Sequence, residues 1–232
     1  MRAIIPRIGL CRIFAVLFSV QLLLIACGGS EGPQRSAAPR PTATPAGLRI
    51  VFLGDSLSAG LGLAEAEAFP AIVGERLRAA GFPVEVVNAG VSGDTSAGGL
   101  ARVDWVLRQR PRILVVELGG NDALRGQELD TTEDNLRQIV RRARESGAQV
   151  LLLGMDVPTN YGPDYTSAFA AIYERISLEE EIPLVPGFVR EVGLDPSLLQ
   201  ADGLHPTAEG QQRLAETLEP YLRDLVLEID GH

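Results

Sequence analysis

The hydrophobic positions beyond residue 46 follow two patterns that alternate along the chain. Short, mostly continuous apolar runs stand at residues 50–53, 84–87, 113–116, 150–153 and 184–185. An apolar run without regular polar alternation is typical of a strand buried on both faces, as in a parallel sheet. The runs therefore predict five parallel strands.

Stripes of helical spacing separate these runs. Apolar residues at 69, 72, 73 and 77 share one helix face, and those at 136, 139, 140 and 143 share another, after a cap-like segment at 131–134. Two more helices are expected, at about residues 166–181 and from about residue 207 onward. Strands that alternate with helices predict a single α/β domain over residues 47–232.

The amino-terminal segment has a different pattern. Residues 1–12 hold three arginines and no acidic residue, and an apolar run follows at residues 13–25. This is the layout of a secretory signal, and the run is shorter than the roughly 20 apolar residues of a membrane span. The run ends in Leu-Ile-Ala-Cys, which resembles the lipobox of bacterial lipoproteins. We expect a signal peptide over residues 1–26 and a lipidated Cys27, with plain secretion as the alternative.

Residues 27–46 are expected to tether the domain to a membrane. Four prolines and several small residues follow Cys27 without apolar periodicity, which is typical of a semi-extended linker. Loss of residues 1–26 would move the net charge from −9 to −12. An acidic domain is repelled by an anionic bilayer, so the lipid would hold the protein in the bacterial cell envelope.

Composition excludes several classes of protein. The chain is 46% hydrophobic and 22% charged, as in ordinary globular proteins, and its negative charge argues against a nucleic-acid partner. With two Cys and two His, no Cys/His metal site is expected, and no cofactor. All 21 basic residues are Arg, so no phosphate-binding P-loop with its lysine is present in the sequence.

Candidate chemistry stands directly after the first and third apolar runs. In open α/β sheets, ligands bind beyond the carboxyl ends of the strands. Ser56 stands at a predicted helix start, where peptide N–H groups favour negative charge, so it is either a nucleophile or a helix N-cap. Asn121 follows two glycines, and its amide either binds an oxyanion or closes an Asx turn.

Two further segments extend this set. The glycines around Gly93 would let backbone amides approach a ligand, or simply form a capped turn. Asp202 precedes His205 by three residues, so its carboxylate can hold one ring nitrogen while the other acts as a base; an inert surface histidine is the alternative. Together these segments form the parts of a serine hydrolase at one sheet edge. The Gly-x-Ser-x-Gly elbow of α/β-hydrolases is absent at Ser56.

Five segments carry a resemblance to a known family. They are GDSLSAG at 54–60, NAGVSGDTSAGGLAR at 88–102, VELGGNDALRG at 116–126, PTNYG at 158–162 and DGLHP at 202–206. On these segments, and in this order, the chain resembles the SGNH (GDSL) hydrolase family over residues 47–225. The resemblance implies a flavodoxin-like, three-layer α/β/α sandwich with a five-stranded parallel sheet.

The resemblance also implies roles for single residues. Ser56 would be the nucleophile, His205 the general base and acid, and Asp202 the residue that orients the histidine. The oxyanion hole would comprise the backbone N–H groups of Ser56 and Gly93 and the side-chain amide of Asn121.

Two more residues are expected at the substrate. Val157 and Pro158 stand in a segment that resembles the acyl-binding loops of the family, so we expect them to contact an acyl chain; loop packing is the alternative.

The expected function is that of a monomeric serine esterase. It would act on short to medium acyl esters or lysophospholipids, and acyl-CoA thioesterase activity is also within the range of the family. One alternative is a carbohydrate deacetylase of the same family, which would release acetate from acetylated sugars. The other is a lipid-anchored binding protein without turnover, which would ignore a serine-directed phosphonate.

Overall fold

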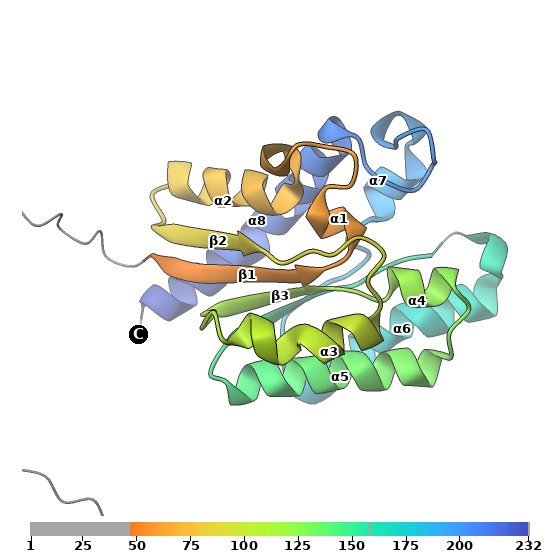
Figure 1. Ribbon diagram of the computed structural model, residues 1–232, viewed down its shortest axis with the longest axis horizontal. Coiled ribbons are helices and arrows are strands. Elements are labelled where there is room, and N and C mark those ends of the chain that lie inside the picture. The colour runs from red at the N-terminus through yellow and green to blue at the C-terminus, as the bar shows by residue number, and fades with distance from the viewer. Residues whose placement is uncertain (1–46, 158, 232) are drawn as a thin grey trace, which may run out of the picture. The chain divides into compact units, whose positions relative to one another are not determined.

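Five strands follow the five apolar runs predicted from the sequence. The computed structural model describes residues 47–157 and 159–231. All neighbouring strands pair in parallel, in the order β2-β1-β3-β4-β5 (Figure 1). This is the flavodoxin-like order of a doubly wound α/β fold, as expected. The strands are β1 Leu48–Gly54, β2 Val84–Asn88, β3 Ile113–Glu117, β4 Gln149–Leu153 and β5 Leu184–Val185.

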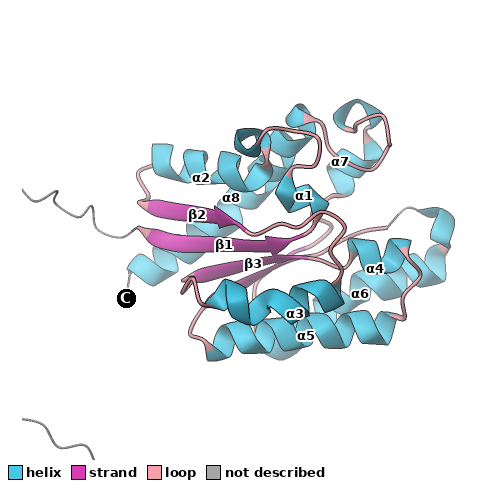
Figure 2. Ribbon diagram, in the orientation of Figure 1, coloured by secondary structure: helices cyan, strands magenta, loops and turns pink. Residues whose placement is uncertain are grey.

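Helices cover both faces of this sheet. In Figure 2, α2 and α8 lie on one side of the strands, and α3, α5 and α6 lie on the other. The α-helices are α1 Ser56–Ala59, α2 Phe69–Ala79, α3 Ser96–Leu107, α4 Gly120–Leu124, α5 Leu129–Glu145, α6 Pro163–Glu180, α7 Arg190–Leu194 and α8 Ala208–Asp230. Three short 3-10 helices are η1 Glu65–Glu67, η2 Thr159–Tyr161 and η3 Pro196–Leu198. The three-layer α/β/α sandwich is therefore confirmed.

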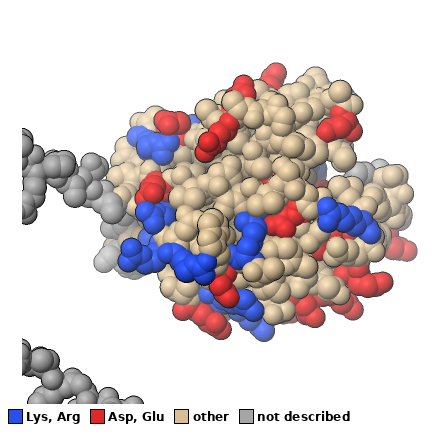
Figure 3. All heavy atoms as spheres, viewed as in Figure 1, with Lys and Arg blue, Asp and Glu red and all other residues tan. Residues whose placement is uncertain are grey.

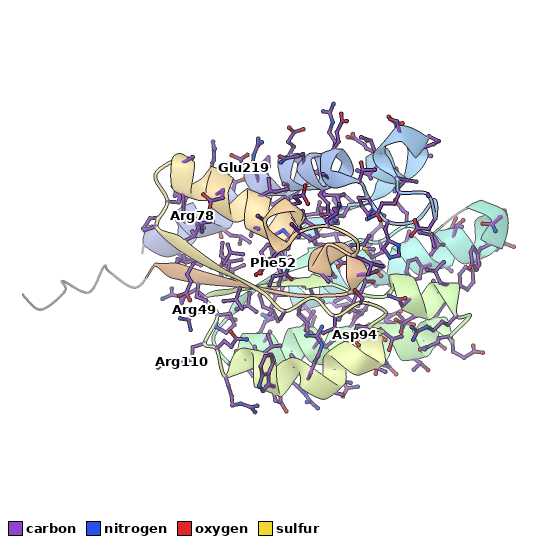
Figure 4. The ribbon with its side chains drawn as sticks, turned by 45° about the horizontal axis from the view of Figure 1, so that its top comes forward. Arg49, Phe52, Arg78, Asp94, Arg110 and Glu219 are labelled. Atoms are coloured by element: carbon purple, nitrogen blue, oxygen red, sulfur yellow. The ribbon has the colours of Figure 1, made fainter. Side chains whose placement is uncertain are left out.

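Strand β1 shows why its sequence is apolar without interruption. Ile50 and Phe52 pack into the core under α2 and α8, whereas Val51 and Leu53 pack into the core under α3, α5 and α6. All four side chains are fully buried. Full burial of such a side chain contributes about 1.5–3 kcal/mol. Phe52, labelled in Figure 4, also meets Phe69 of α2 edge to face, and the ring centroids are 5.6 Å apart.

Helix α5 begins earlier than its sequence predicts. The cap-like segment at 131–134 lies inside the helix, which starts at Leu129. Thr132 of that segment is buried, and its hydroxyl contacts the Asp122 carboxylate at 3.4 Å. Because this residue bonds across to another element, it does not cap its own helix.

The connections after β1, β2, β3 and β4 meet at one edge of the sheet. Helices α1 and α4 lie at this edge, directly after β1 and β3 (Figure 1). The predicted signal peptide, lipidated Cys27 and linker lie outside the described residues. Within residues 47–157 and 159–231, no helix is long and apolar enough to cross a membrane.

Candidate active site

The turn between β1 and α1 presents Ser56 at the carboxyl edge of the sheet. Ser56 is the first residue of α1 and is 7% exposed. The preceding residue, Asp55, caps the helix, because its Oδ1 accepts a hydrogen bond of 2.9 Å from the Leu57 backbone N–H. The structure thus assigns the N-cap to Asp55 and leaves the Ser56 hydroxyl free for another contact.

That contact is His205, which arrives from the loop before α8. The His205 Nε2 lies 2.9 Å from the Ser56 Oγ, and its Nδ1 lies 2.6 Å from the Asp202 Oδ2. The remaining oxygen, Oδ1, accepts from the backbone N–H groups of Leu204 and His205 at 2.9 and 3.0 Å. Hydrogen bonds from the His205 backbone, the His205 ring and the Leu204 backbone hold the pKa of Asp202 well below its usual range. The three predicted residues are therefore joined in one hydrogen-bonded series.

The three N–H groups predicted to form the oxyanion hole have capacity left to bind a ligand. Within the part of the chain that the structure describes, neither the Ser56 nor the Gly93 backbone N–H donates a hydrogen bond. Gly93 has φ +80, a conformation that favours glycine. The Asn121 side-chain Nδ2 donates to Asp55 Oδ2 at 3.0 Å. Because an amide nitrogen carries two protons, the second remains available to a ligand.

The loop after β4 holds Val157 and Pro158, which are expected to contact an acyl chain. Val157 packs in the core with residues of β4 and α6 and is 9% exposed. This position supports the packing alternative, while its contact with an acyl chain stays a prediction. Pro158 lies outside the described residues.

Sequence reasoning missed a second carboxyl group near Ser56. Glu117, the last residue of β3, is fully buried, and its Oε2 accepts from the Ser58 hydroxyl at 2.7 Å. The same oxygen accepts from the backbone N–H groups of Ser58 and Asp55, each at 3.2 Å. The available signal was an acidic residue that directly continues the apolar run at 113–116.

These contacts define a class of protein. A serine at a helix start, bonded to a histidine that is itself held by a carboxylate, is the arrangement of serine hydrolases. The chain belongs to the GDSL-like Lipase/Acylhydrolase family, whose sequence model matches residues 52–213. It is therefore a hydrolase of that family.

Similar proteins of known name support membership of this hydrolase family. The chain is 44% identical to esterase TesA of Pseudomonas aeruginosa over 186 residues, which cover 80% of this chain and 92% of that protein. It is 43% identical to thioesterase 1/protease 1/lysophospholipase L1 of Escherichia coli, with 76% and 84% covered.

Solved structures agree with the fold. The crystal structure of TesA superposes with a TM-score of 0.74 at 44% identity, covering 76% of this chain and 99% of that one. The esterase EstA from Pseudoalteromonas, solved with monoethylphosphonate as inhibitor, superposes with a TM-score of 0.73 at 31% identity, covering 76% and 97%. Residues 47–232 lie within one compact unit of this chain, and this part is used in the experiments below.

Proposed function

We propose that this protein is a serine esterase that cleaves short to medium acyl esters through an acyl-enzyme on Ser56. The observation that carries the proposal is the series from Ser56 Oγ to His205 Nε2 at 2.9 Å and from His205 Nδ1 to Asp202 Oδ2 at 2.6 Å. A base within hydrogen-bond reach of a hydroxyl, itself oriented by a third group, is what an activated nucleophile requires.

Acylation follows from this geometry. His205 Nε2 accepts the Ser56 proton while Oγ attacks the acyl carbonyl, and the carbonyl π electrons move onto oxygen. The oxyanion is bound by the Ser56 and Gly93 N–H groups and the free proton of Asn121 Nδ2. His205 then gives its proton to the leaving alcohol as the bond between the carbonyl carbon and that oxygen breaks. Asp202, charged and fixed by two backbone N–H groups, holds the ring in the required tautomer throughout.

Deacylation repeats these steps with water. His205 takes a proton from water, the hydroxide attacks the acyl carbon of the Ser56 ester, and the oxyanion occupies the same three donors. Collapse returns the proton from His205 to Ser56 Oγ and releases the carboxylic acid. One histidine therefore serves both halves of the reaction, which matches its single contact to the serine.

The surroundings of Ser56 favour an apolar acyl group over a sugar. Five large apolar side chains that are 37–48% exposed stand on connections that follow the strands at the catalytic edge, where Leu194 of α7 is 77% exposed. Scattered exposed apolar residues are ordinary, but these share the edge at which substrate must enter. They are Leu61, Val91, Leu124, Tyr161 and Leu204. Relatives named esterase and lysophospholipase support the same substrate class.

We also propose that the enzyme is exported and held in the cell envelope by a lipid on Cys27. The Arg-rich start, the apolar run and the sequence Leu-Ile-Ala-Cys support this location. Acyl-CoA is cytosolic, so esters and lysophospholipids are the natural substrates that export favours. Expression of the full chain in a bacterial host tests this: lipidation predicts a membrane-bound protein that Cys27→Ser releases, whereas plain secretion predicts no difference between the two.

Hydrolysis of nitrophenyl esters from acetyl to long acyl chains, by the domain over residues 47–232, tests the activity. We expect turnover with a chain-length optimum, its loss in Ser56→Ala, and no change in Ser167→Ala, an exposed serine on α6. Acetate release from acetylated sugars without ester turnover would replace the esterase with a deacetylase. Ligand binding without turnover of either substrate would contradict an enzymatic role.

A further inference from the structure

Glu117 occupies a space that the Gly54 backbone leaves open for it. The two residues are direct neighbours in the parallel register of β1 and β3. A Cβ on Gly54 would lie 2.6 Å from the Glu117 Oε2 and 2.1 Å from the Ser58 Oγ. Such distances are far inside van der Waals contact, so a side chain at Gly54 would displace the carboxyl group. The glycine that opens the β1–α1 turn is therefore coupled to an acid on the next strand.

The two oxygens of Glu117 have different surroundings. Oε2 accepts three hydrogen bonds, from Ser58 Oγ, Ser58 N and Asp55 N, whereas Oε1 has no partner in the described parts of the chain. No arginine forms an ion pair with Glu117 among residues 47–157 and 159–231. A buried carboxylate without a cation and with one unpaired oxygen is strongly disfavoured, and protonation removes that cost.

Asp55 connects this acid to the reacting groups. Its carboxylate is 3% exposed, and its two oxygens accept from Leu57 N at the start of α1 and from the Asn121 side chain. Burial raises the pKa of Asp55, and burial together with the negative charge of Asp55 raises the pKa of Glu117 well above its usual range. The two residues are in direct contact, because the Asp55 backbone N–H donates to Glu117 Oε2 at 3.2 Å, and one proton between their carboxyl groups relieves the repulsion.

We propose that Glu117 is a positioning residue, a neutral carboxylic acid whose Oε1 proton bonds the Asp55 carboxylate and so fixes the serine turn and the Asn121 amide. The neutral acid places a single negative charge on the pair, and that charge faces the amide that must later bind an oxyanion. This inference deepens the proposed function, because Glu117 touches no substrate and acts only through Asp55.

The other polar groups around the pair are few. From α3, Arg102 Nη2 donates to the Gly54 carbonyl at 2.9 Å, and from α6 the buried Tyr173 hydroxyl donates to the Leu118 carbonyl at 2.9 Å. Asp122 of α4 accepts hydrogen bonds from the Ser96 backbone N–H and hydroxyl. His205 lies on the far side of Asp55 and adds positive charge there when protonated. No second buried base is present to take the proton from Glu117 among these groups.

Two substitutions separate a neutral acid from a charged one. Glu117→Gln keeps an N–H donor and a carbonyl acceptor but cannot ionise, so we expect kcat at neutral pH to stay within about threefold of the native value. Glu117→Leu removes every hydrogen bond and is expected to lower kcat about 10- to 100-fold with little change in KM. A loss in Glu117→Gln as large as that in Glu117→Leu would overturn the proposal and require a carboxylate.

The pH dependence gives a readout that packing alone would not move. An unfolded Glu ionises near pH 4, whereas native Glu117 keeps its proton to higher pH, so the native state binds more protons and loses stability as pH rises through this range. Glu117→Gln lacks this loss. Its stability relative to the native domain, measured by urea unfolding, should therefore increase from pH 5 to pH 9.

A constant difference between the two proteins would overturn the neutral acid. Difference infrared spectra supply a direct check, since a protonated carboxyl stretch should disappear in Glu117→Gln. Either failure would leave the Ser56 chemistry untouched, because Ser56→Ala reports on that separately.

A second, independent observation concerns the opposite edge of the sheet. The loop between α3 and β3 bears Arg108, Arg110 and Arg112, all exposed and without an ion pair among the described residues. Hydrogen bonds from Arg112 N to the Arg49 carbonyl at 2.8 Å and from Arg49 Nη1 to the Gln109 carbonyl at 2.6 Å join this loop to the start of β1. Arginines gather over this end in Figure 3, and Figure 4 shows Arg49 and Arg110 there together.

We infer that this basic loop binds the anionic head groups of a phospholipid bilayer. Trp105, 55% exposed and one turn earlier in α3, adds the aromatic side chain that favours a membrane interface. The domain begins at the same edge; the inference rests on the proposed location at a membrane. Acidic side chains also stand at this edge, since Glu85 pairs with Arg49 and Asp104 precedes Trp105, so the three unpaired arginines supply the charge that anionic lipid would meet.

Vesicle binding by the domain tests this surface. We expect binding to phosphatidylglycerol vesicles but not to phosphatidylcholine vesicles, weakened by salt, with a blue shift of fluorescence from the single tryptophan of the chain. Replacement of the three loop arginines by Gln should weaken binding at least tenfold. The control Arg175→Gln, Arg213→Gln, Arg223→Gln removes equal charge from α6 and α8 and should change binding less than threefold. Equal losses in both variants, or equal binding to a DNA duplex, would overturn the assignment to lipid.

Discussion

Two carboxyl groups are joined to the serine turn by hydrogen bonds, and their surroundings shift their pKa values in opposite directions. The Asp202 side chain is 47% exposed and accepts three hydrogen bonds, which lower its pKa. Glu117 is fully buried beside another carboxylate, and both conditions raise its pKa. The same functional group therefore serves as a charged acceptor on one side and, in our proposal, as a neutral donor on the other.

Asp202 and Glu117 both position other groups, but only Asp202 needs its own negative charge to do so. Asp202 must be negative, since it accepts a hydrogen bond from the His205 Nδ1–H and stabilises the imidazolium that forms during attack. The buried pair needs only one negative charge, because a second one would repel the developing oxyanion near Asn121. Burial and exposure thus assign the two roles without any difference in chemistry between the side chains.

The largest effect on kcat is expected from removal of the exposed carboxylate, Asp202. Asp202→Asn turns an acceptor for His205 Nδ1 into an amide that favours the wrong tautomer, so kcat should fall about ten thousandfold. Steady-state kinetics on a nitrophenyl ester measures this. A fall of less than tenfold would mean that another group orients the histidine.

A smaller loss of activity should follow from removal of the Asn121 amide, which bonds the buried Asp55 carboxylate. Asn121→Ala removes one oxyanion donor, and kcat should fall about 100- to 1000-fold while KM changes little. The substitution also leaves Asp55 Oδ2 without its partner, so stability should drop by about 1–3 kcal/mol. A rise in KM at constant kcat would instead place Asn121 in ground-state binding.

The buried pair can also be disturbed by crowding. Gly54→Ala places a Cβ against Ser58 and Glu117, so the free energy of unfolding should fall by about 1–3 kcal/mol, together with activity. Gly193→Ala in α7 is the matched control. A Cβ there meets no atom within 4 Å, so stability should rise by about 0.5–1 kcal/mol. Equal behaviour of the two variants in urea would contradict the coupling between Gly54 and Glu117.

The smallest effect concerns the helix that follows His205. Thr207 caps α8 by accepting from Gly210 N at 3.2 Å, so Thr207→Ala should cost about 1 kcal/mol of stability. Thr217→Ala, inside the same helix, removes a hydroxyl without removing a cap and should cost less. Thermal unfolding of both variants measures the difference, and turnover at low temperature should stay close to native in each.

The sheet could be predicted from the sequence because its strands are continuous apolar runs. The five runs became five strands within two residues, since a strand buried on both faces admits few polar residues. Helix α3 did not appear among the predictions, because Gly98 and Gly99 and the small residues around them weaken its periodicity. Gly99 is buried, and a Cβ there would lie 2.2 Å from Leu118 Cδ1. Close packing against Leu118 therefore explains why a glycine stands at this position of the helix.

The candidate site also contains residues that the sequence predicts and one, Glu117, that it does not. Ser56 and Asn121 stand in short helices directly after strands, and Asp202 and His205 stand in a turn before α8, so these polar residues are conspicuous beside the apolar runs. Glu117 continues a strand, and its importance depends on Gly54 from a segment more than 60 residues away, a pairing that only the register reveals. Contacts between distant strands carry no local signal, so this half of the site required the structure.

The central claim is that Ser56 forms the covalent intermediate, and intact-mass analysis after reaction with a nitrophenyl phosphonate tests it most directly. The account predicts one adduct per chain, located on Ser56 by peptide mapping, absent in Ser56→Ala and retained in Ser167→Ala. An unmodified native domain, or an adduct that persists in Ser56→Ala, would contradict it.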